Sequence, residues 1–207
     1  MAGLWIKICG MRTREAIEAA AEAGADAVGF VFCEVSPRNL SLDEARGLRV
    51  AVPQGVECVA VFLHPSQALV DAVVAAIGPD WVQADLEDLA RLRVPAAPRV
   101  LPVLRGDAPL PSPAPRRCLL ESARSGMGER GDWSAAARVA PLTELVLAGG
   151  LDEHNVGDAV RSVRPFGVDV SSGVESSRGV KDAARIRGFI RAARAAAAPG
   201  IAEENRR

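Results

Sequence analysis

Short apolar runs alternate with stretches of helical pattern along the chain. Eight of these runs have the length and composition of strands: residues 4–9, 27–32, 58–62, 81–83, 100–104, 118–120, 145–148 and 167–170. The run at 27–32 has no polar side chain, which is typical of a parallel strand covered on both faces. Pro102 lies in the fifth run and weakens it as a strand, because proline donates no ladder hydrogen bond.

Serine or threonine precedes three of the helical stretches, at Thr13, Ser41 and Ser66. These are N-cap residue types, and Glu44 follows Ser41 at capping-box spacing. A last helix, rich in alanine and arginine, is expected over about 180–198, and a polar tail follows at 199–207. Four prolines between 107 and 115 exclude a regular helix there and favour a short surface crossover.

Strands that are mostly followed by helices predict parallel βα units. Two α/β folds compete: an open doubly wound sheet, and a closed parallel sheet with outer helices, the (β/α)8 TIM barrel. Eight units favour the barrel, although about 250 residues is more typical of it. The turn after the first strand reads Cys9-Gly10-Met11-Arg12. It lacks the GxGxxG pattern of a dinucleotide site, so a Rossmann protein is not indicated.

Composition agrees with a globular protein. The chain has 207 residues with a formal net charge of -1, and 49% of them are hydrophobic. We expect one domain over 1–207, with its barrel core at about 4–198. Near-neutral charge does not indicate a nucleic-acid or membrane partner, and no apolar run approaches the ~18 residues of a membrane helix. No secretory leader is recognised, so a cytoplasmic location is expected.

Cysteine and histidine spacing predicts no metal site. None of the four cysteines forms a CxxC pair, and the only histidines are His64 and His154. Both histidines precede probable turn or helix-start residues and are expected at the surface. Reduced thiols are the default in this compartment. No exposed apolar stripe is evident, so a monomer is expected.

Candidate chemistry follows from the barrel, because active sites of this fold lie at the carboxyl ends of the strands. Five small residues follow the last two strands, at Gly149, Gly150, Ser171, Ser172 and Gly173. Small residues let backbone N–H groups approach an anion, so a phosphate site is predicted there. The alternative is that these residues only make tight turns.

Other strand ends carry ionisable groups. Cys9 ends the first strand with Lys7 on the same face, and a nearby cation can help a thiol act as a base. Glu121 ends the sixth strand, about half a barrel away, where an acid could act across a small substrate. Arg38 could grip a carboxylate with its planar fork. Plainer interpretations are a buried apolar cysteine, a solvated glutamate and a surface arginine.

Several motifs together resemble the phosphoribosylanthranilate isomerase family. They are Lys7-Ile8-Cys9-Gly10, Gly29-Phe30-Val31-Phe32 with Ser36-Pro37-Arg38, Leu147-Ala148-Gly149-Gly150-Leu151, Asn155-Val156, Asp169-Val170-Ser171-Ser172-Gly173-Val174-Glu175, and Gly126 and Gly128 before Asp132-Trp133. The resemblance covers roughly residues 7–190 in the right order. It implies a (β/α)8 barrel of tryptophan biosynthesis that performs an Amadori rearrangement of N-(5-phosphoribosyl)anthranilate without metal or cofactor.

The resemblance also implies roles for individual residues. Cys9 would remove the proton from C2 of the ribose, and the acid at the end of the sixth strand would protonate the ring oxygen. Arg38 would hold the anthranilate carboxylate, while the loops with Gly150, Ser172 and Gly173 would hold the phosphate. The remaining expected substrate contacts are Lys7, Gln83, Asp85, Gly126, Gly128 and Asp169.

Two positions depart from the family pattern. The acid is Glu121 where the family has aspartate, and Asp85 stands at a histidine position. A displacement of about 1 Å can cost roughly 100-fold in rate. An extra anion in a site for an anionic substrate is costly unless it is paired, protonated or aimed at a donor.

Three hypotheses therefore stand. The first is the family's isomerase. The second is a diverged paralogue, in which Asp85 contacts a donor on a related phosphosugar or aryl-amine substrate. The third is a non-catalytic protein that binds a phosphorylated ligand.

Overall fold

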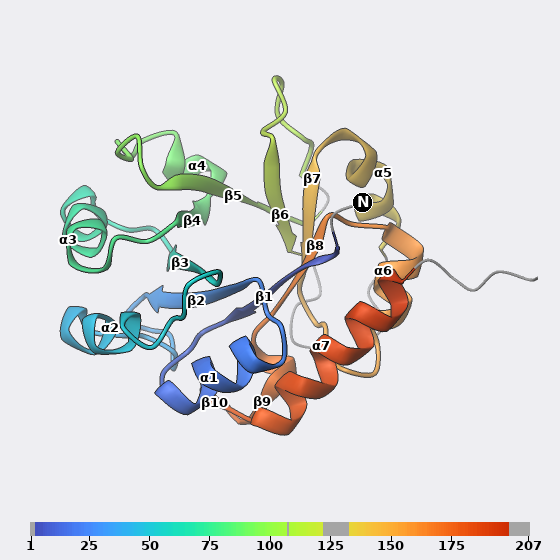
Figure 1. Cartoon of the computed structure of the whole chain (residues 1–207). Coiled ribbons are helices and arrows are strands. Elements are labelled where there is room, and N and C mark those ends of the chain that lie inside the picture. Colours follow the sequence, from blue (N-terminus) through green and yellow to red (C-terminus); the bar gives the residue numbers. More distant parts are fainter. Residues whose placement is uncertain (1–2, 107, 122–132, 199–207) are drawn as a thin grey trace, which may run out of the picture.

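The computed structural model describes residues 3–106, 108–121 and 133–198. Eight parallel strands close into a barrel in the order β1-β2-β3-β4-β5-β6-β7-β8, and helices surround it (Figure 1). This confirms the predicted TIM barrel. The strands are β1 Trp5–Cys9, β2 Ala27–Phe32, β3 Glu57–Phe62, β4 Trp81–Asp85, β5 Arg99–Arg105, β6 Arg117–Glu121, β7 Glu144–Ala148 and β8 Gly167–Val170.

The connections between strands hold the helices and a small hairpin. The helices are α1 Arg14–Glu22, α2 Leu42–Arg49, α3 Gln67–Ile77, α4 Leu86–Leu89, α5 Ser134–Val139, α6 Val156–Val163 and α7 Ala183–Ala197, with 3-10 turns at η1 Ala140–Leu142 and η2 Ser172–Val174. After η2, the strands β9 Glu175–Ser177 and β10 Val180–Lys181 pair as an antiparallel hairpin. The two ends of the barrel meet where β1 pairs with β8, and α7 packs beside α1 (Figure 1).

The predicted caps are confirmed. The side chains of Thr13, Ser41 and Ser66 each accept a backbone N–H in the first turn of the following helix. Ser41 and Glu44 form the reciprocal capping box. Each cap satisfies a donor that the first helical turn leaves without an intrahelical partner, which sets where the helix starts.

The structure corrects two element boundaries. The expected helix over 180–198 begins only at Ala183, because residues 180–181 pair in the hairpin and Asp182 caps the helix. The fourth strand runs further than residues 81–83, to Asp85, whereas the sixth ends at Glu121 as expected. Polar residues at the mouth of a barrel can continue the backbone ladder, although they break the apolar pattern that defines a strand in the sequence. The expected tail at 199–207 lies outside the described residues.

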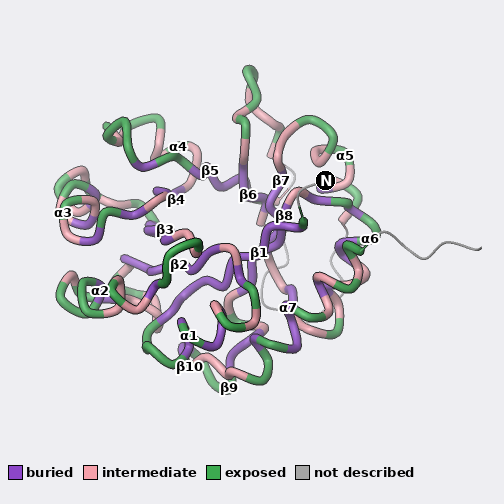
Figure 2. Tube along the Cα trace, in the orientation of Figure 1, coloured by how far each residue is buried: buried purple, intermediate pink, exposed green. Residues whose placement is uncertain are grey.

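The core has two layers. One fills the barrel, and the other lies between the strands and the helices; Figure 2 shows the central strands buried and the outer helix faces exposed. Arg117 is tucked against aromatic rings of the interior layer, 4.1 Å from the Phe166 ring and 4.8 Å from the Trp81 ring. No described helix has the length and apolar character needed to cross a membrane.

Candidate active site

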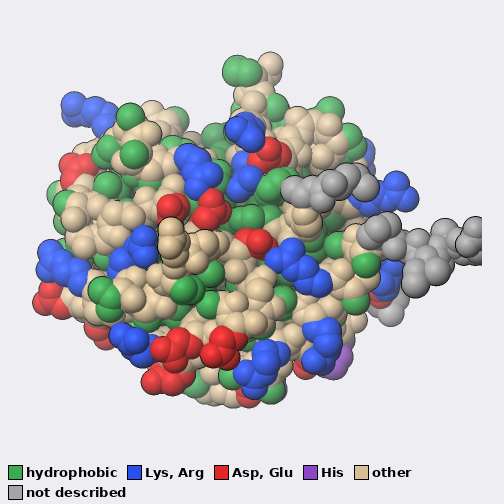
Figure 3. Space-filling model, in the orientation of Figure 1, with side chains coloured by type: hydrophobic (Ala, Val, Ile, Leu, Met, Phe, Trp, Pro, Cys, Tyr) green, Lys and Arg blue, Asp and Glu red, His purple; other side chains and the backbone are tan. Residues whose placement is uncertain are grey.

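A cavity of about 240 Å³ opens at the carboxyl ends of the strands. Eight of the residues singled out in the sequence line it: Cys9, Gln83, Glu121, Gly149, Gly150, Asp169, Ser171 and Ser172. Its apolar wall is formed by side chains such as Val31, Val61, Phe62, Val103 and Leu119. The barrel therefore brings a thiol, a carboxyl and a small-residue loop to one cavity. Figure 3 shows charged side chains of both signs interspersed on one face of the molecule.

Four other expected residues lie next to residues of the cavity wall but do not line the cavity themselves: Lys7, Arg38, Asp85 and Gly173. Gly126 and Gly128 lie outside the described residues, as does the loop that contains them.

Cys9 sits over a buried ion pair. Lys7 Nζ lies 2.8 Å from Asp169 Oδ1, and Lys7 is fully buried. Burial alone would lower the pKa of Lys7, but Asp169 and Cys9 outweigh it and raise that pKa. Burial raises the pKa of the Cys9 thiol, and the Lys7 cation opposes the rise. The Lys7 cation, and to a lesser extent that of Lys181, therefore favours the Cys9 thiolate against the effect of burial.

Glu121 shares an arginine with Asp85. Arg105 is at the end of β5, where it pairs in register with Glu121 of β6, so their side chains share one face. Its Nη2 lies 2.9 Å from Asp85 Oδ1, and its Nη1 donates to Glu121 Oε2. Arg105 lines the cavity, and sequence reasoning missed it although it is a charged residue at a strand end.

The position of Asp85 explains how the extra anion is tolerated. Asp85 is paired with Arg105 rather than turned to the cavity, so its charge is compensated within the protein. This pairing removes the reason to expect an unusual donor on the substrate.

The loops after β7 and β8 (loops seven and eight) pack closely where phosphate binding was predicted. Gly149 and Gly150 have φ values of 91° and 66°, which favour glycine. A Cβ on Gly173 would lie only 2.0 Å from the backbone oxygen of Leu151. Asn155 Nδ2 donates to the Gly150 carbonyl over 2.8 Å and ties that loop to the start of α6. Backbone of both loops can therefore approach an anion closely.

Arg38 is held by a carboxylate that sequence reasoning did not assign to the site. Its Nε and Nη2 lie 2.6 and 2.8 Å from the two oxygens of Glu175. The side chain crosses Gly10, where a Cβ would lie 2.4 Å from Arg38 Cδ. Arg38 thus lies next to Cys9 in the fold, at the edge of the cavity.

Lys181, also missed, joins this cluster to loop eight. Its Nζ lies 2.8 Å from Glu175 Oε1 and donates to the Ser171 carbonyl over 2.9 Å. Burial opposes ionisation of Glu175, but its bonds from Arg38, Lys181 and Gly179 lower its pKa to about 2. In the sequence, Glu175 and Lys181 flank a turn that contains Gly179, and an acid and a lysine on either side of such a turn could have indicated this cluster.

Gln83 presents an unsatisfied acceptor. Its Oε1 is buried and has no hydrogen-bond partner among the described residues, and its side chain lines the cavity. Buried polar atoms are nearly always bonded, so a ligand donor is expected there.

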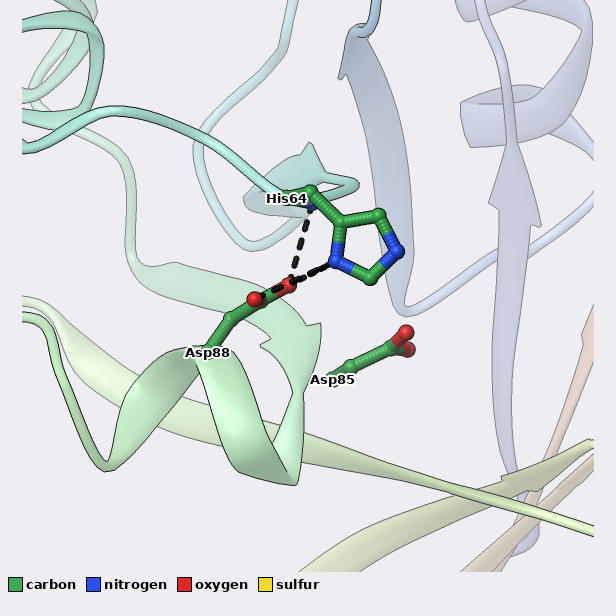
Figure 4. Close-up of side chains that lie close together, drawn as sticks. All are labelled: His64, Asp85 and Asp88. Atoms are coloured by element: carbon green, nitrogen blue, oxygen red, sulfur yellow. Dashed lines mark hydrogen bonds and ion pairs between the residues drawn. The ribbon is translucent and has the colours of Figure 1, made fainter.

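His64, Asp85 and Asp88 could each offer one ligand atom within 4.8 Å of the others. Figure 4 shows His64 bonded to Asp88, with the Asp85 carboxylate apart from both. His64 Nδ1 lies 3.1 Å from Asp88 Oδ2, and Asp85 forms an ion pair with Arg105. These groups satisfy one another, so we assign no cation to them. As predicted, His64 and His154 are surface residues, with side chains 73% and 85% exposed.

Comparisons with known proteins agree with this geometry. Residues 6–192 match the family model described as N-(5'phosphoribosyl)anthranilate (PRA) isomerase. The chain is 38% identical to the N-(5'-phosphoribosyl)anthranilate isomerase of Pelobacter propionicus, over 91% of this chain and 95% of that one. The crystal structure of TrpF from Jonesia denitrificans superposes with a TM-score of 0.82 at 35% identity, covering 95% and 99% of the chains.

One further solved structure is a phosphoribosyl anthranilate isomerase in complex with reduced 1-(o-carboxyphenylamino)-1-deoxyribulose 5-phosphate. It superposes with a TM-score of 0.76 at 32% identity, covering 93% of this chain and 99% of that chain.

Proposed function

This chain belongs to the N-(5'-phosphoribosyl)anthranilate isomerase family and is an isomerase of tryptophan biosynthesis, and we propose that Cys9 and Glu121 are the base and acid of its reaction. The single observation that supports these roles best is that both side chains line one cavity, from strands β1 and β6 on opposite sides of the barrel.

The reaction needs one acid and one base. Glu121 in its protonated form gives its proton to the ribose ring oxygen as the C1–O bond breaks and the amine nitrogen forms a C1=N bond. Cys9 as thiolate then takes the proton from C2, and the electrons of that C–H bond form an enolamine. A proton is added at C1 and the C2 hydroxyl proton leaves, which gives the ketone of the product. General acid–base catalysis of this kind typically contributes about 10²- to 10⁴-fold each.

Three groups of residues are proposed to hold the substrate. The backbone of Gly149, Gly150, Ser171 and Ser172 binds the phosphate, supported by the close packing of the two loops. Arg38 binds the anthranilate carboxylate with the part of its guanidinium that Glu175 leaves free. Gln83 Oε1 accepts a hydrogen bond from the substrate, which would satisfy an atom that otherwise has no partner among the described residues.

Lys7 and Asp169 are proposed to act through Cys9. Their ion pair keeps a cation beside the thiol in a site with no exposure at Lys7, so the thiolate form is stabilised. Neither residue needs to contact the substrate for this role.

The test is turnover of N-(5'-phosphoribosyl)anthranilate by the purified protein, followed as the loss of substrate fluorescence. Cys9→Ala and Glu121→Gln should each lower kcat by at least about 100-fold. Two matched controls should retain activity. Cys118→Ala lies near the start of β6, away from the carboxyl end where the cavity opens, and Glu87→Gln lies on the exposed face of α4. Full activity in Cys9→Ala or Glu121→Gln would overturn that residue's role.

A further inference from the structure

We propose that Asp85 and Arg105 form a positioning pair that holds Glu121 for the acid step. The proposal rests on the proposed function of Glu121. It assigns a role to both departures from the family pattern, because Glu121 and Asp85 contact the same guanidinium.

Asp85 contacts more of the Arg105 guanidinium than Glu121 does. Arg105 Nε lies 3.1 and 3.2 Å from the two oxygens of Asp85, and Nη2 lies 2.9 Å from Oδ1. Only Nη1 donates to Glu121, at Oε2. Asp85 thus holds two of the three nitrogens, and the other Glu121 oxygen makes no hydrogen bond to a described residue.

The strands set this arrangement. Arg105 and Glu121 are register partners on β5 and β6, and Asp85 ends the neighbouring strand β4, in register with Val103. Arg105 and Val103 are two residues apart on β5, so their side chains lie on the same face of the sheet. Because β5 lies between β4 and β6, the Arg105 side chain can reach both Asp85 and Glu121. A planar fork suits this bridge, because it can bond two carboxylates at fixed angles.

Charge explains why both partners are needed. Without Arg105, two carboxylates would face each other at the mouth of the cavity, where an anionic substrate must also bind. Without Asp85, the whole guanidinium would be free to form a two-pronged pair with Glu121, and such a pair favours the ionised carboxylate that cannot give a proton. With Asp85 in place, Glu121 is oriented by one nitrogen and keeps one oxygen for the substrate.

An alternative role for Arg105 is to bind the substrate directly, since its side chain lines the cavity and is 53% exposed. The two roles differ in kinetics. A substrate anchor contributes to KM, whereas a group that positions the acid contributes to kcat.

The experiment compares Asp85→Asn, Arg105→Gln, Arg105→Lys and the double variant Asp85→Asn/Arg105→Gln with the unmodified protein. We expect Arg105→Gln to lower kcat by about 30-fold and Asp85→Asn by about 10-fold, each with KM within about 3-fold. The double variant should be no slower than Arg105→Gln, because the two residues act as one unit. Arg105→Lys should recover only part of kcat, since one ammonium cannot bridge both acids.

Controls separate this proposal from the acid assignment. Arg91→Gln, an exposed arginine after α4, should have no effect on kcat. Each variant's affinity for the reduced product analogue, which needs no acid, should stay within about 3-fold of the unmodified protein.

A large rise in KM with unchanged kcat would make Arg105 a substrate anchor and overturn the proposal. So would additive losses in the double variant, or a loss of activity that follows a loss of folded protein in thermal unfolding. If Glu121→Gln keeps full activity, the acid assignment fails. If Glu121→Gln is inactive while Asp85→Asn and Arg105→Gln are fully active, only the positioning pair fails.

Discussion

Replacing Glu175 by glutamine is the sharpest perturbation of the support around Arg38. The carboxylate receives four hydrogen bonds, two from Arg38, one from Lys181 and one from the backbone N–H of Gly179. A glutamine amide at the same place must turn one donor toward other donors, and it leaves two cations without their counter-charge.

The size of the effect follows from the pKa of Glu175. Burial acts against the charged form, but the four bonds lower the pKa from 4.5 to about 2. At about 1.4 kcal/mol per pH unit, this corresponds to about 3 kcal/mol of folding free energy. Because the folded pKa lies below the unfolded one, the contribution is fully present above pH 4.5 and is lost as the pH falls toward 2.

The assay is urea unfolding of the unmodified protein and Glu175→Gln at pH 7 and pH 3, followed by circular dichroism. At pH 7 the variant should be less stable by about 3 kcal/mol, and the difference should shrink by about 2 kcal/mol at pH 3. Glu87→Gln, an exposed acid, is the matched control and should show no such change. A difference that stays constant between the two pH values would refute the reasoning, because the carboxylate would then not be held ionised by these donors.

Three further predictions concern the base, the phosphate loops and the floor of the barrel. Since the Lys7 cation opposes the rise that burial causes in the pKa of the Cys9 thiol, and only the thiolate is a base, Lys7→Met should lower kcat/KM by about 100-fold; an unchanged kcat/KM would contradict this. Gly173→Ala places a Cβ 2.0 Å from the Leu151 carbonyl, so KM should rise by about 10-fold or more, whereas an unchanged KM would exclude close packing as the reason for glycine. Arg117→Met removes a cation stacked on aromatic rings far from the cavity, so urea unfolding should show a loss of about 1–3 kcal/mol while kcat and KM stay unchanged.

Local pattern was enough to predict the elements of the barrel. The strands are short apolar runs, and the caps at Thr13, Ser41 and Ser66 depend on residues only three positions apart. Such features depend on neighbours in the chain, so one sequence shows them directly. The end of the fourth strand was predicted too early, because Asp85 continues the strand and backbone pairing does not require an apolar side chain.

The candidate site was predicted in part. Knowing that a barrel binds its substrate at the carboxyl ends of its strands was enough to bring Cys9, Glu121 and the small residues after β7 and β8 into one list, and all of these except Gly173 line the cavity. What the strand-end rule could not supply was the partner of each charged group. Arg105 was passed over as one more arginine among many.

The sequence by itself therefore determined the fold and the family and pointed to candidate reactive groups, because each depends on residue types at fixed spacings. Only the tertiary structure decided how the charges are shared. Arg105 bridges acids 20 and 16 residues away, and Arg38 meets Glu175 across 137 residues. Closure of the barrel sets these distances, and ion pairs depend on distance and burial rather than on position in the chain.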